Sequence, residues 1–410
     1  MQRRLFVHMG TTLVGELLQD DDGRLGFAYG EDWLQSDDSF EISCSLPLRS
    51  ESFSQKECRG FFGGVLPEQS NRKLISRILQ ISEQNDFAML EQIGGECAGA
   101  LTFTSELLEP ADLTVSYRSL ADNELLEILD ILPKRPLLAG EKGVRLSLAG
   151  AQDKLAVCVD EAGNLSLPLA GAPSSHILKP ALATWDGIVS NETYCMNLAK
   201  QVGLSAAATS SHMVGNVEYL LSKRFDRITT QGEIQRLHQE DFCQALAVPA
   251  EIKYQSEGGP DLKACFDLVR TRSSHVVADL SELLNAVIFN WLVGNNDAHG
   301  KNFSFLYNTN GERRFAPLYD VVCTQYYPEL TNTMAMKIGK EGRADFIGPA
   351  EIEIFAKETG LAVAATKRRF VEMAKIVLDG LDGLDSNDET SKAIKLLISE
   401  RCSRALNRLS

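Results

Sequence analysis

The segment NNDAHGKNFSFLY, residues 295–307, decides the fold of this 410-residue chain. It follows a strongly apolar stretch, residues 280–293, whose composition and length predict a buried helix. The segment itself predicts a polar loop that leads into a short strand. Within the loop, Asp297 and Asn302 are separated by four residues. One short loop with this D-x-x-x-x-N spacing can present two oxygens to two different atoms.

The catalytic loops of protein kinases have the same spacing. Their Asp reaches the attacking hydroxyl group, while their Asn reaches a magnesium ion bound to the nucleotide. The metal also needs a hard anionic ligand, which Asp320 in APLYDVV (residues 316–322) can supply. The pattern FSFLY, NTNGE, RRFAPLY predicts a hairpin that returns Asp320 to the side of Asn302. Kinases have DFG where this chain has YDV, so the match is one of role and order.

These residue types also have ordinary structural roles. Asp and Asn are common in loops, and Asp320 could cap a helix, so the D-x-x-x-x-N spacing alone is a weak signal. Upstream, Lys179 ends the short apolar strand HILKP (residues 176–180) and is a candidate for holding nucleotide phosphates. Glu192, early in the helix predicted over NETYCMNLAKQVGL (residues 191–204), is the candidate partner of that lysine. The structural alternatives are a surface lysine and a first-turn acid favoured by the helix dipole.

A loop that covers the phosphates is expected further upstream, and LSLAGAQDK (residues 146–154) fits that role. Its small residues Ala149, Gly150 and Ala151 allow backbone N–H groups to approach an anion, and Lys154 adds a positive charge. The chain contains neither GxxxxGK[ST] nor GxGxxG, which disfavours a P-loop NTPase and a Rossmann dinucleotide site.

Composition and charge disfavour several classes of protein. The formal net charge is −15, and an acidic chain is a poor non-specific binder of nucleic acid because phosphate contacts need surplus Lys and Arg. Nine scattered cysteines form no CxxC pair, which predicts reduced thiols and no zinc site. The first residues lack the apolar run of a targeting signal, and the apolar stretch 283–293 is too short to span a bilayer. These features predict a cytoplasmic protein without a membrane segment.

The sequence predicts four successive parts. Residues 1–110 predict a small α+β subdomain, with a hairpin around a DDDG turn and helices over NRKLISRIL and after a capping Asp86. Residues 111–143 predict a connecting helix and linker. Residues 144–235 predict a small mixed lobe, in which LSLAGAQDKLAVCVD forms two strands around a tight loop. Residues 236–410 predict a mainly helical lobe that carries the catalytic loop.

Taken together, the motifs resemble the HipA family of bacterial toxin kinases. The resemblance covers residues 5–380 and is specific because many segments match in order. It implies an α+β, protein-kinase-like two-lobed fold: a small mixed N-lobe with a β-sheet and a mainly helical C-lobe, preceded by a small α+β N-terminal subdomain. The segments that carry it are FFGGVLPEQSNR (61–72), RLSLAGAQDK (145–154), HILKP (176–180), NETYCMNLAKQVGL (191–204), KRFDR (223–227), HQEDFCQAL (238–246), YQSEGGP (254–260), NWLVGNNDAHGKNFS (290–304) and APLYDVV (316–322).

The resemblance also implies a role for each site residue. Asp297 would orient or deprotonate a protein Ser or Thr hydroxyl, while Asn302 and Asp320 would hold Mg²⁺. Residues 223–225 would form the hinge whose backbone meets adenine. The residues implied to bind ATP are Ala149, Gly150, Ala151, Gln152, Asp153, Lys154, Lys179, Lys223, Arg224, Phe225, His299, Gly300, Lys301, Asn302, Tyr319 and Asp320.

Ser147 matches the serine that HipA-type kinases phosphorylate on themselves. A phosphate adds a charge of about −1.5 to −2. Beside a loop that binds ATP phosphates, this charge would repel the nucleotide and could eject the loop. Arg145 would be the local partner of the phosphate. The structural alternative is a strand serine that faces solvent.

Family members are typically encoded beside a small helix-turn-helix antitoxin, HipB, and the pair binds operator DNA. The resemblance therefore implies a toxin kinase with a HipB-like partner, which contacts DNA only jointly with that partner. It also implies a protein substrate, with an aminoacyl-tRNA synthetase as the family's best-known kind of target. Two alternatives remain open: a small-molecule phosphotransferase of kinase-like fold, and a catalytically inactive co-repressor subunit.

Overall fold

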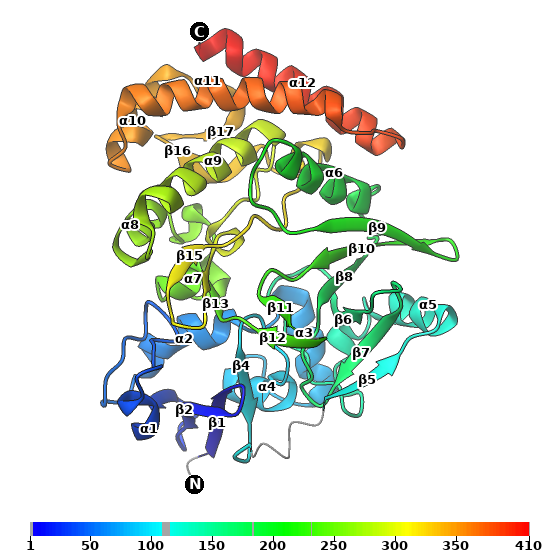
Figure 1. Ribbon diagram of the computed structural model, residues 1–410, viewed down its shortest axis with the longest axis vertical. Coiled ribbons are helices and arrows are strands. Elements are labelled where there is room, and N and C mark those ends of the chain that lie inside the picture. Colours follow the sequence, from blue (N-terminus) through cyan, green and yellow to red (C-terminus); the bar gives the residue numbers. More distant parts are fainter. Residues whose placement is uncertain (1–2, 109–114, 183, 231, 410) are drawn as a thin grey trace. The chain divides into compact units, whose positions relative to one another are not determined.

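The chain forms two compact units, each assembled from separate stretches of sequence (Figure 1). The computed structural model describes residues 3–108, 115–182, 184–230 and 232–409. Unit 1 contains residues 1–180, 212–251 and 306–312, and unit 2 contains residues 181–211, 252–305 and 313–410. Since neither unit is continuous in sequence, the four-part division along the chain stays a prediction.

A four-stranded antiparallel sheet forms the first part of unit 1, in the order β3-β2-β1-β4. Its strands are β1 (Arg3–Met9), β2 (Thr12–Gln19), β3 (Leu25–Tyr29) and β4 (Leu101–Thr104). Leu5, Val7 and Phe27 are fully buried at alternate strand positions, as one-sided burial requires. The accompanying helices are α1 (Glu31–Gln35), α2 (Gln55–Gly64), α3 (Gln69–Leu79) and α4 (Asp86–Ile93). The predicted hairpin and the helix over NRKLISRIL are confirmed.

A six-stranded sheet forms the second part of unit 1, in the order β5-β7-β6-β8-β10-β9. Its strands are β5 (Ser116–Ser119), β6 (Leu155–Val159), β7 (Leu165–Leu169), β8 (His176–Pro180), β9 (Thr209–Val214), which begins in unit 2, and β10 (Val217–Lys223). The smaller elements of unit 1 are α5 (Asp122–Ile131), η2 (Pro136–Leu138), β11 (Arg227–Thr230), β12 (Glu233–Arg236), β13 (Gln239–Asp241) and α7 (Phe242–Ala245).

Two local predictions in unit 1 are wrong. The segment LSLAG is not a strand, because Leu146 and Gly150 form isolated bridges to distant loops and the strand begins at Leu155. Asn85, rather than Asp86, caps α4, because its side chain accepts the backbone N–H three residues later at 2.9 Å. No local pattern predicts the helix α2, because its FFGG sequence is a weak helix former.

Unit 2 is mainly helical. Its helices are α6 (Ile188–Gln201), α8 (Leu262–Arg272), α9 (Val276–Val293), α10 (Pro349–Glu358), α11 (Val363–Gly380) and α12 (Glu389–Leu409). Its short elements are β14 (Ser304–Tyr307), which ends in unit 1, β15 (Arg313–Phe315), β16 (Thr333–Ile338), β17 (Glu341–Arg343), and the 3₁₀ turns η3 (Ala250–Ile252), which begins in unit 1, η4 (Gln255–Glu257), η5 (Gly300–Asn302), η6 (Thr324–Tyr326), η7 (Ala344–Phe346) and η8 (Leu381–Gly383). A sheet-rich unit 1 and a helical unit 2 agree with the predicted α+β class.

The apolar helix α9 is the core helix of unit 2. Leu283, Phe289 and Val293 are fully buried, and the Trp291 ring packs on Phe370 of α11 with centroids 5.5 Å apart. Helices α11 and α12 both pack against α9 and against each other (Figure 1). Within the part of the chain that the structure describes, α9 is the one helix long and apolar enough to cross a membrane, and 56% of it is buried.

Candidate active site

The turn that carries Asp297 begins where α9 ends. Gly294 caps the helix with a φ of +77°, in the left-handed region that favours glycine. Asn295 braces the turn, because its side chain donates to Asn290 Oδ1 at 2.7 Å and accepts the Asp297 N–H at 3.1 Å. The His299 N–H donates to the Asp297 carbonyl at 2.8 Å. Asp297 is therefore an exposed residue on a turn that is fixed by its own local hydrogen bonds.

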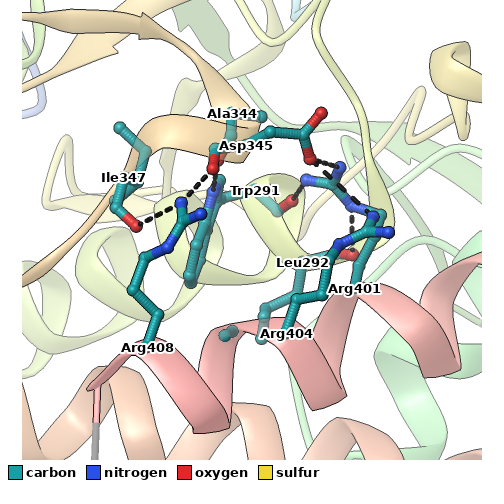
Figure 2. A pocket seen from close by; sticks show the side chains of 9 residues that line it. Trp291, Leu292, Ala344, Asp345, Ile347, Arg401, Arg404 and Arg408 are labelled. Atoms are coloured by element: carbon teal, nitrogen blue, oxygen red, sulfur yellow. Dashed lines mark hydrogen bonds and ion pairs between the residues drawn. The ribbon is translucent and has the colours of Figure 1, made fainter.

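Arg401 of α12 supports the helix end that leads into this turn (Figure 2). Its buried guanidinium donates to the carbonyls of Trp291 and of Leu292, the latter at 3.0 Å. It also donates to the side chain of Gln325, whose own N–H donates to the Gly294 carbonyl at 3.1 Å. Burial lowers the pKa of Arg401. A cation at a helix C-terminus is favourable, and here it also ties α9 to the segment of Gln325.

Tyr254 touches the candidate catalytic carboxylate directly. Its hydroxyl donates to Asp297 Oδ1 at 2.9 Å, across 43 residues of sequence. Its ring meets the His299 ring edge-on, with centroids 5.2 Å apart. No pattern around Tyr254 predicts a role for it, although YQSEGGP is one of the matching motifs. The tyrosine hydroxyl within that motif was the available signal, but no local pattern reveals a contact over this separation.

Asn302 ends the 3₁₀ turn η5 that follows Asp297. Its Oδ1 accepts the His299 N–H at 3.1 Å, and its own N–H donates to the His299 carbonyl at 2.9 Å. Gly300 and Lys301 are buried in the same turn. These bonds hold the amide in one direction. An amide oxygen has two lone pairs, so Oδ1 retains acceptor capacity for a cation.

The predicted hairpin returns the chain to the candidate catalytic loop. The Ala316 N–H donates to the Ser304 carbonyl at 2.9 Å, and the Tyr319 hydroxyl donates to the Lys301 carbonyl at 2.6 Å. Asp320 follows with a φ of +59°, a left-handed conformation that is uncommon for a residue with a side chain. It is not a helix cap, because the next helical turn, η6, begins four residues later. Backbone strain of this kind is frequent at functional sites.

Asn302 and Asp320 offer oxygen donors of the kind that magnesium prefers. Mg²⁺ is usually held by one or two protein ligands, with waters and substrate phosphates completing an octahedron. The described residues contain no group of three or more His, Cys, Asp or Glu side chains that could hold a metal ion. One amide oxygen and one carboxylate therefore fit an ion shared with a nucleotide better than a metal enclosed by protein.

Glu192 is buried in the second turn of α6. It is therefore not the first-turn acid of the structural alternative. The neighbouring Asn191 side chain donates to the Cys323 carbonyl at 3.1 Å and accepts the Cys323 N–H at 2.8 Å. These two bonds join α6 to the segment that follows Asp320. The pairing of Glu192 with Lys179 stays a prediction.

Ser147 lies in unit 1 and is fully buried. Its hydroxyl donates to the Val65 carbonyl at 3.0 Å, and its N–H donates to the Glu96 carbonyl at 2.8 Å. The alternative of a serine that faces solvent is therefore wrong. The expected phosphate partner, Arg145, donates to backbone carbonyls. A hydroxyl buried in this way can reach a phosphoryl donor only after its segment moves.

The candidate phosphate-covering loop, residues 149–154, folds back on itself. Gly150 has a φ of +104°, and a Cβ added there would lie 2.6 Å from the Lys154 ammonium. That ammonium donates to the Ala149 carbonyl at 2.7 Å. The Asn71 side chain donates to another carbonyl of the loop at 3.0 Å. The loop thus combines small residues with a cation that its own backbone holds in place.

Lys179 is buried on β8, opposite Leu220 of β10, so the alternative of a surface lysine is wrong. Lys223 is exposed at the end of β10, opposite His176. Burial, with a smaller effect of the Lys223 charge, lowers the pKa of His176 to about 4. Phe225 is half-buried in the turn after β10. The strand lysine and the candidate hinge therefore belong to neighbouring strands of one sheet.

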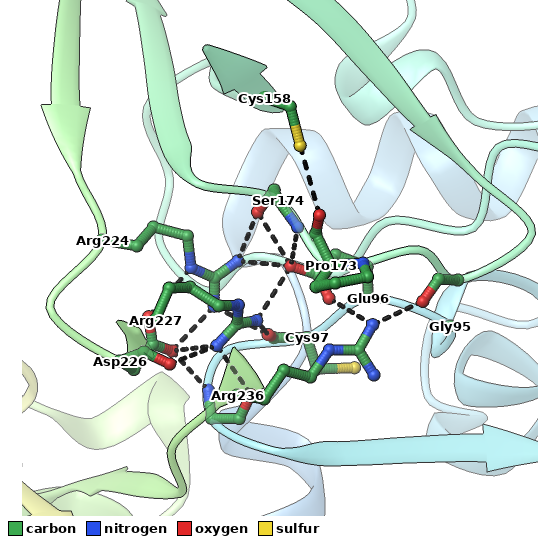
Figure 3. Close-up of polar contacts among 12 residues, drawn as sticks. Gly95, Glu96, Cys97, Cys158, Pro173, Ser174, Arg224, Asp226, Arg227 and Arg236 are labelled. Carbon is green, nitrogen blue, oxygen red and sulfur yellow. Dashed lines mark hydrogen bonds and ion pairs between the residues drawn. The ribbon is translucent and has the colours of Figure 1, made fainter. Parts of the chain in front are cut away.

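Arg224 belongs to a buried ion cluster, here called the Glu96 network (Figure 3). Glu96 meets the guanidinium groups of Arg224, Arg227 and Arg236 at 2.9, 2.8 and 2.6 Å. Asp226 meets Arg224 and Arg227 at 2.7 and 2.9 Å. Burial alone would raise the pKa of Glu96, but the three arginine charges outweigh it and lower the pKa to about 2. Since the Arg224 side chain is used here, a nucleotide contact by Arg224 would involve its backbone.

The predicted site residues fall into one group in each unit. In unit 2, hydrogen bonds join the segments of the catalytic and metal candidates into one assembly of Asp297, His299, Gly300, Lys301, Asn302, Tyr319 and Asp320. In unit 1 the phosphate-covering loop, the strand lysine and the hinge candidates are Ala149, Gly150, Ala151, Gln152, Asp153, Lys154, Lys179, Lys223, Arg224 and Phe225.

Comparison with known families decides the membership of the chain. Residues 5–104 match the model of the HipA N-terminal domain, and residues 146–381 match the model of a HipA-like C-terminal domain. The second match alone covers more than half of the sequence. The chain belongs to the HipA family. The predicted resemblance is therefore confirmed.

Relatives of this HipA-family chain include named kinases. A candidate kinase of Sinorhizobium fredii, Y4mE, is 45% identical over 366 residues, which are 88% of this chain and 87% of that protein. The serine/threonine-protein kinase toxin HipA of Shewanella oneidensis is 29% identical over 426 residues, with 98% and 96% of the two chains covered. The chain is thus a homologue of a HipA serine/threonine kinase toxin.

A solved structure of the family confirms the fold class. In the complex of Shewanella oneidensis HipA with HipB and operator DNA, one chain matches with a TM-score of 0.87 at 27% sequence identity. The match covers 99% of this chain and 98% of the other. The two-lobed, kinase-like HipA fold with its N-terminal subdomain is therefore the fold of this protein.

Proposed function

We propose that this protein is an ATP- and Mg²⁺-dependent serine/threonine protein kinase and the toxin of a toxin–antitoxin pair. One observation carries the proposal: Asp297 is exposed on a braced turn that is bonded to the segments of Asn302 and Asp320. A reactive carboxylate together with two side-chain oxygens that can bind a metal ion suits phosphoryl transfer. Homology to a HipA kinase toxin supports the same activity.

In the proposed reaction, Asp297 orients a protein Ser or Thr hydroxyl and accepts its proton as the oxygen attacks the γ-phosphorus. The bond from that phosphorus to the ADP oxygen breaks, and ADP is the leaving group. Asn302 and Asp320 would hold Mg²⁺, which when bound neutralises charge on the phosphates. Lys179 and the loop of residues 149–154 would bind the phosphates, and residues 223–225 would meet adenine.

Ser147 is the proposed site of autophosphorylation. Its buried hydroxyl means that the modified form cannot keep the segment where it is, because a phosphate carries about −1.5 to −2 charge. The bonds from Ser147 to Val65 and Glu96 would then be lost. This would detach the loop that is proposed to cover ATP, and the kinase would be switched off.

A small helix-turn-helix protein of the HipB kind is the proposed partner. A structural relative of this chain was solved as HipA with HipB and operator DNA. The net charge of −15 suits a subunit that leaves most phosphate contacts to its partner. We assign the protein to the cytoplasm, as a co-repressor with its antitoxin. The proposed substrate is a cytosolic protein of translation, such as an aminoacyl-tRNA synthetase.

Mass spectrometry after incubation with Mg-ATP tests the activity and the Ser147 assignment together. We expect a single added phosphate on a peptide that contains Ser147. Asp297→Ala should lower the transfer rate by about 10²- to 10⁴-fold without changing the circular dichroism spectrum. Asp37→Ala removes an exposed carboxylate of unit 1 and serves as the matched control.

The outcomes separate the alternatives. A wild-type transfer rate in Asp297→Ala would refute the site assignment. Transfer to a metabolite but to no protein would favour a small-molecule phosphotransferase. ATP binding without any transfer by the wild-type protein would favour an inactive co-repressor.

A further inference from the structure

The residues around Tyr254 form a tight turn, residues 252–260, here called the Tyr254 turn. The Gly259 N–H donates to the Tyr254 carbonyl at 2.9 Å, which closes the turn. Gly258 has a φ of +98°, and a Cβ on Gly259 would lie 2.3 Å from the Ile252 carbonyl oxygen. Both glycines are therefore required by the backbone path. The turn has one shape, and it presents the tyrosine from a fixed backbone position.

The strand β16 is hydrogen-bonded both to the Tyr254 turn and to the turn that carries Asp297. The Lys337 N–H of β16 donates to the Gln255 side chain at 2.8 Å. Two residues earlier on the same strand, the Ala335 N–H donates to the Asn296 carbonyl at 2.7 Å. Gln255 follows Tyr254 in sequence, and Asn296 precedes Asp297. The strand β16 therefore sets the spacing between the tyrosine and the catalytic carboxylate.

The direction of the tyrosine ring is also fixed. The ring meets the His299 ring edge-on, at 5.2 Å and an interplanar angle of 80°. The Lys253 ammonium lies over the tyrosine ring, 5.6 Å from its centroid. These contacts aim the hydroxyl at Asp297 Oδ1, to which it donates at 2.9 Å. An oriented donor on one carboxylate oxygen is a charge-assisted hydrogen bond, stronger than a neutral one.

We propose that Tyr254 is a positioning residue for the phosphoryl transfer, an inference that rests on the proposed function. By holding Oδ1, the tyrosine hydroxyl turns Oδ2 of Asp297 toward the acceptor hydroxyl. Rotation about the last bond of an Asp side chain is broad, so an exposed carboxylate needs such a contact to stay aligned. Fixing a reacting group before the reaction lowers the entropic part of the barrier. Tyr254 itself keeps its proton throughout.

Tyr254→Phe removes the hydroxyl and retains the ring that packs on His299. We expect the rate of Ser147 phosphorylation at saturating Mg-ATP to fall about tenfold, the loss expected when one oriented hydrogen bond to a charged group is removed. The ATP concentration at half-maximal rate should change less than twofold, because the hydroxyl that is removed contacts the carboxylate, and the ring that packs on His299 is retained. The acid limb of the pH–rate profile should move to higher pH, because the lost donor favoured the ionised carboxylate.

Tyr117→Phe is the matched control, since its phenol hydroxyl also donates at 2.9 Å, to the Pro173 carbonyl at the edge of the second sheet of unit 1. This variant should keep the wild-type rate and pH profile. The proposal is overturned if Tyr254→Phe is as fast as the wild type, or if its rate falls with an unchanged acid limb.

A second readout keeps this inference separable from the proposed function. Crystal structures of the wild-type and Tyr254→Phe proteins should show one Asp297 rotamer in the former and two or more in the latter. If the wild type transfers no phosphate, the proposed function fails, and this comparison alone decides whether Tyr254 positions Asp297. A single, unchanged Asp297 rotamer in both structures would refute the positioning role.

Discussion

The burial of Ser147 determines what substitutions at this position do. Its hydroxyl is enclosed and bonded to Val65, so Ser147→Ala should cost about 1 kcal/mol of stability. Ser147→Asp instead places a charge where no solvent reaches, which costs several kcal/mol if the segment stays in place. We expect the segment of Ser147 to move out of its buried position. Trypsin should then cleave faster at Lys154, and ATP affinity should fall at least tenfold. Limited proteolysis and calorimetric titration with ATP measure both effects.

Ser403→Asp on the exposed face of α12 is the control for added charge. It should change neither the trypsin cleavage rate at Lys154 nor the ATP affinity. Equal ATP affinity in Ser147→Asp and wild type would show that the segment of Ser147 does not regulate the nucleotide site.

Glu96 is a residue of unit 1 whose ionisation stabilises the folded protein. Its pKa in the folded protein is about 2, below the ordinary value of 4.5. A lowered folded pKa contributes stability that is fully present above pH 4.5 and is lost as the pH falls toward 2. The contribution is roughly 3 kcal/mol. Urea unfolding of the wild type from pH 7 to pH 3 should show the free energy of unfolding falling in that window.

Glu96→Gln removes the charge and leaves the buried Arg224 and Arg227 and the half-buried Arg236 with one carboxylate. We expect a loss of about 3–5 kcal/mol at pH 7 and a weaker pH dependence below pH 4.5. Glu91→Gln breaks an exposed pair with Arg3 and should cost less than about 1 kcal/mol. Equal losses in both variants at pH 7 would contradict the importance of the Glu96 network.

At the scale of elements, the C-terminal helix α12 controls how α9 ends (Figure 2). Arg401→Met would remove the side-chain donor to the carbonyls of Trp291 and Leu292. We expect a loss of about 2–4 kcal/mol in urea unfolding. Because α9 leads into the Asp297 turn, the phosphate transfer rate should also fall severalfold at a temperature where the variant is folded.

Arg404→Met tests whether any arginine of α12 has this effect. The Arg404 side chain is 57% exposed and lies 3.7 Å from Asp345 and 3.9 Å from Glu400. Its removal should cost less than about 0.5 kcal/mol and leave the rate unchanged. If both variants lose the same stability, the capping of α9 by Arg401 is not the cause.

At the scale of the whole molecule, the net charge of −15 bears on the proposed joint binding of operator DNA with an antitoxin. The purified chain alone should not shift the proposed operator DNA at 150 mM salt in a mobility assay, whereas its mixture with the proposed helix-turn-helix partner should. The slope of log affinity against log salt counts released counterions, and it should equal the slope of the partner alone. A mobility shift by the isolated chain would contradict the proposal that the partner makes most of the phosphate contacts. So would a salt slope of the mixture that is steeper than that of the partner alone by two or more.

The fold was predictable wherever a local pattern determines an element. The hairpin around DDDG, the helix over NRKLISRIL and the apolar helix ending at Val293 were predicted because periodicity and turn residues act over a few residues. The strand expected in LSLAG failed for the opposite reason. Leu146 and Gly150 form isolated β-bridges with residues of distant loops, and no local pattern specifies those partners.

The residue types and spacing of the site are properties of the sequence alone. Asp297 and Asn302 lie on one loop, so four intervening residues limit their separation, and the following hairpin brings Tyr319, the neighbour of Asp320, back to Lys301. The family relationship was likewise evident from ordered motifs. All of these depend on short-range chain geometry, which the sequence encodes directly.

Only the tertiary structure decided which side chains control that loop. Tyr254 reaches Asp297 across 43 residues, and Arg401 reaches Leu292 across 109. The burial of Ser147 and of Lys179 could not be predicted from the sequence either, because the local sequence around a serine or lysine does not show whether the side chain is exposed or buried. The physical reason is that long-range contacts depend on how whole elements pack. The packing energy comes from many residues, so no single stretch of sequence determines it.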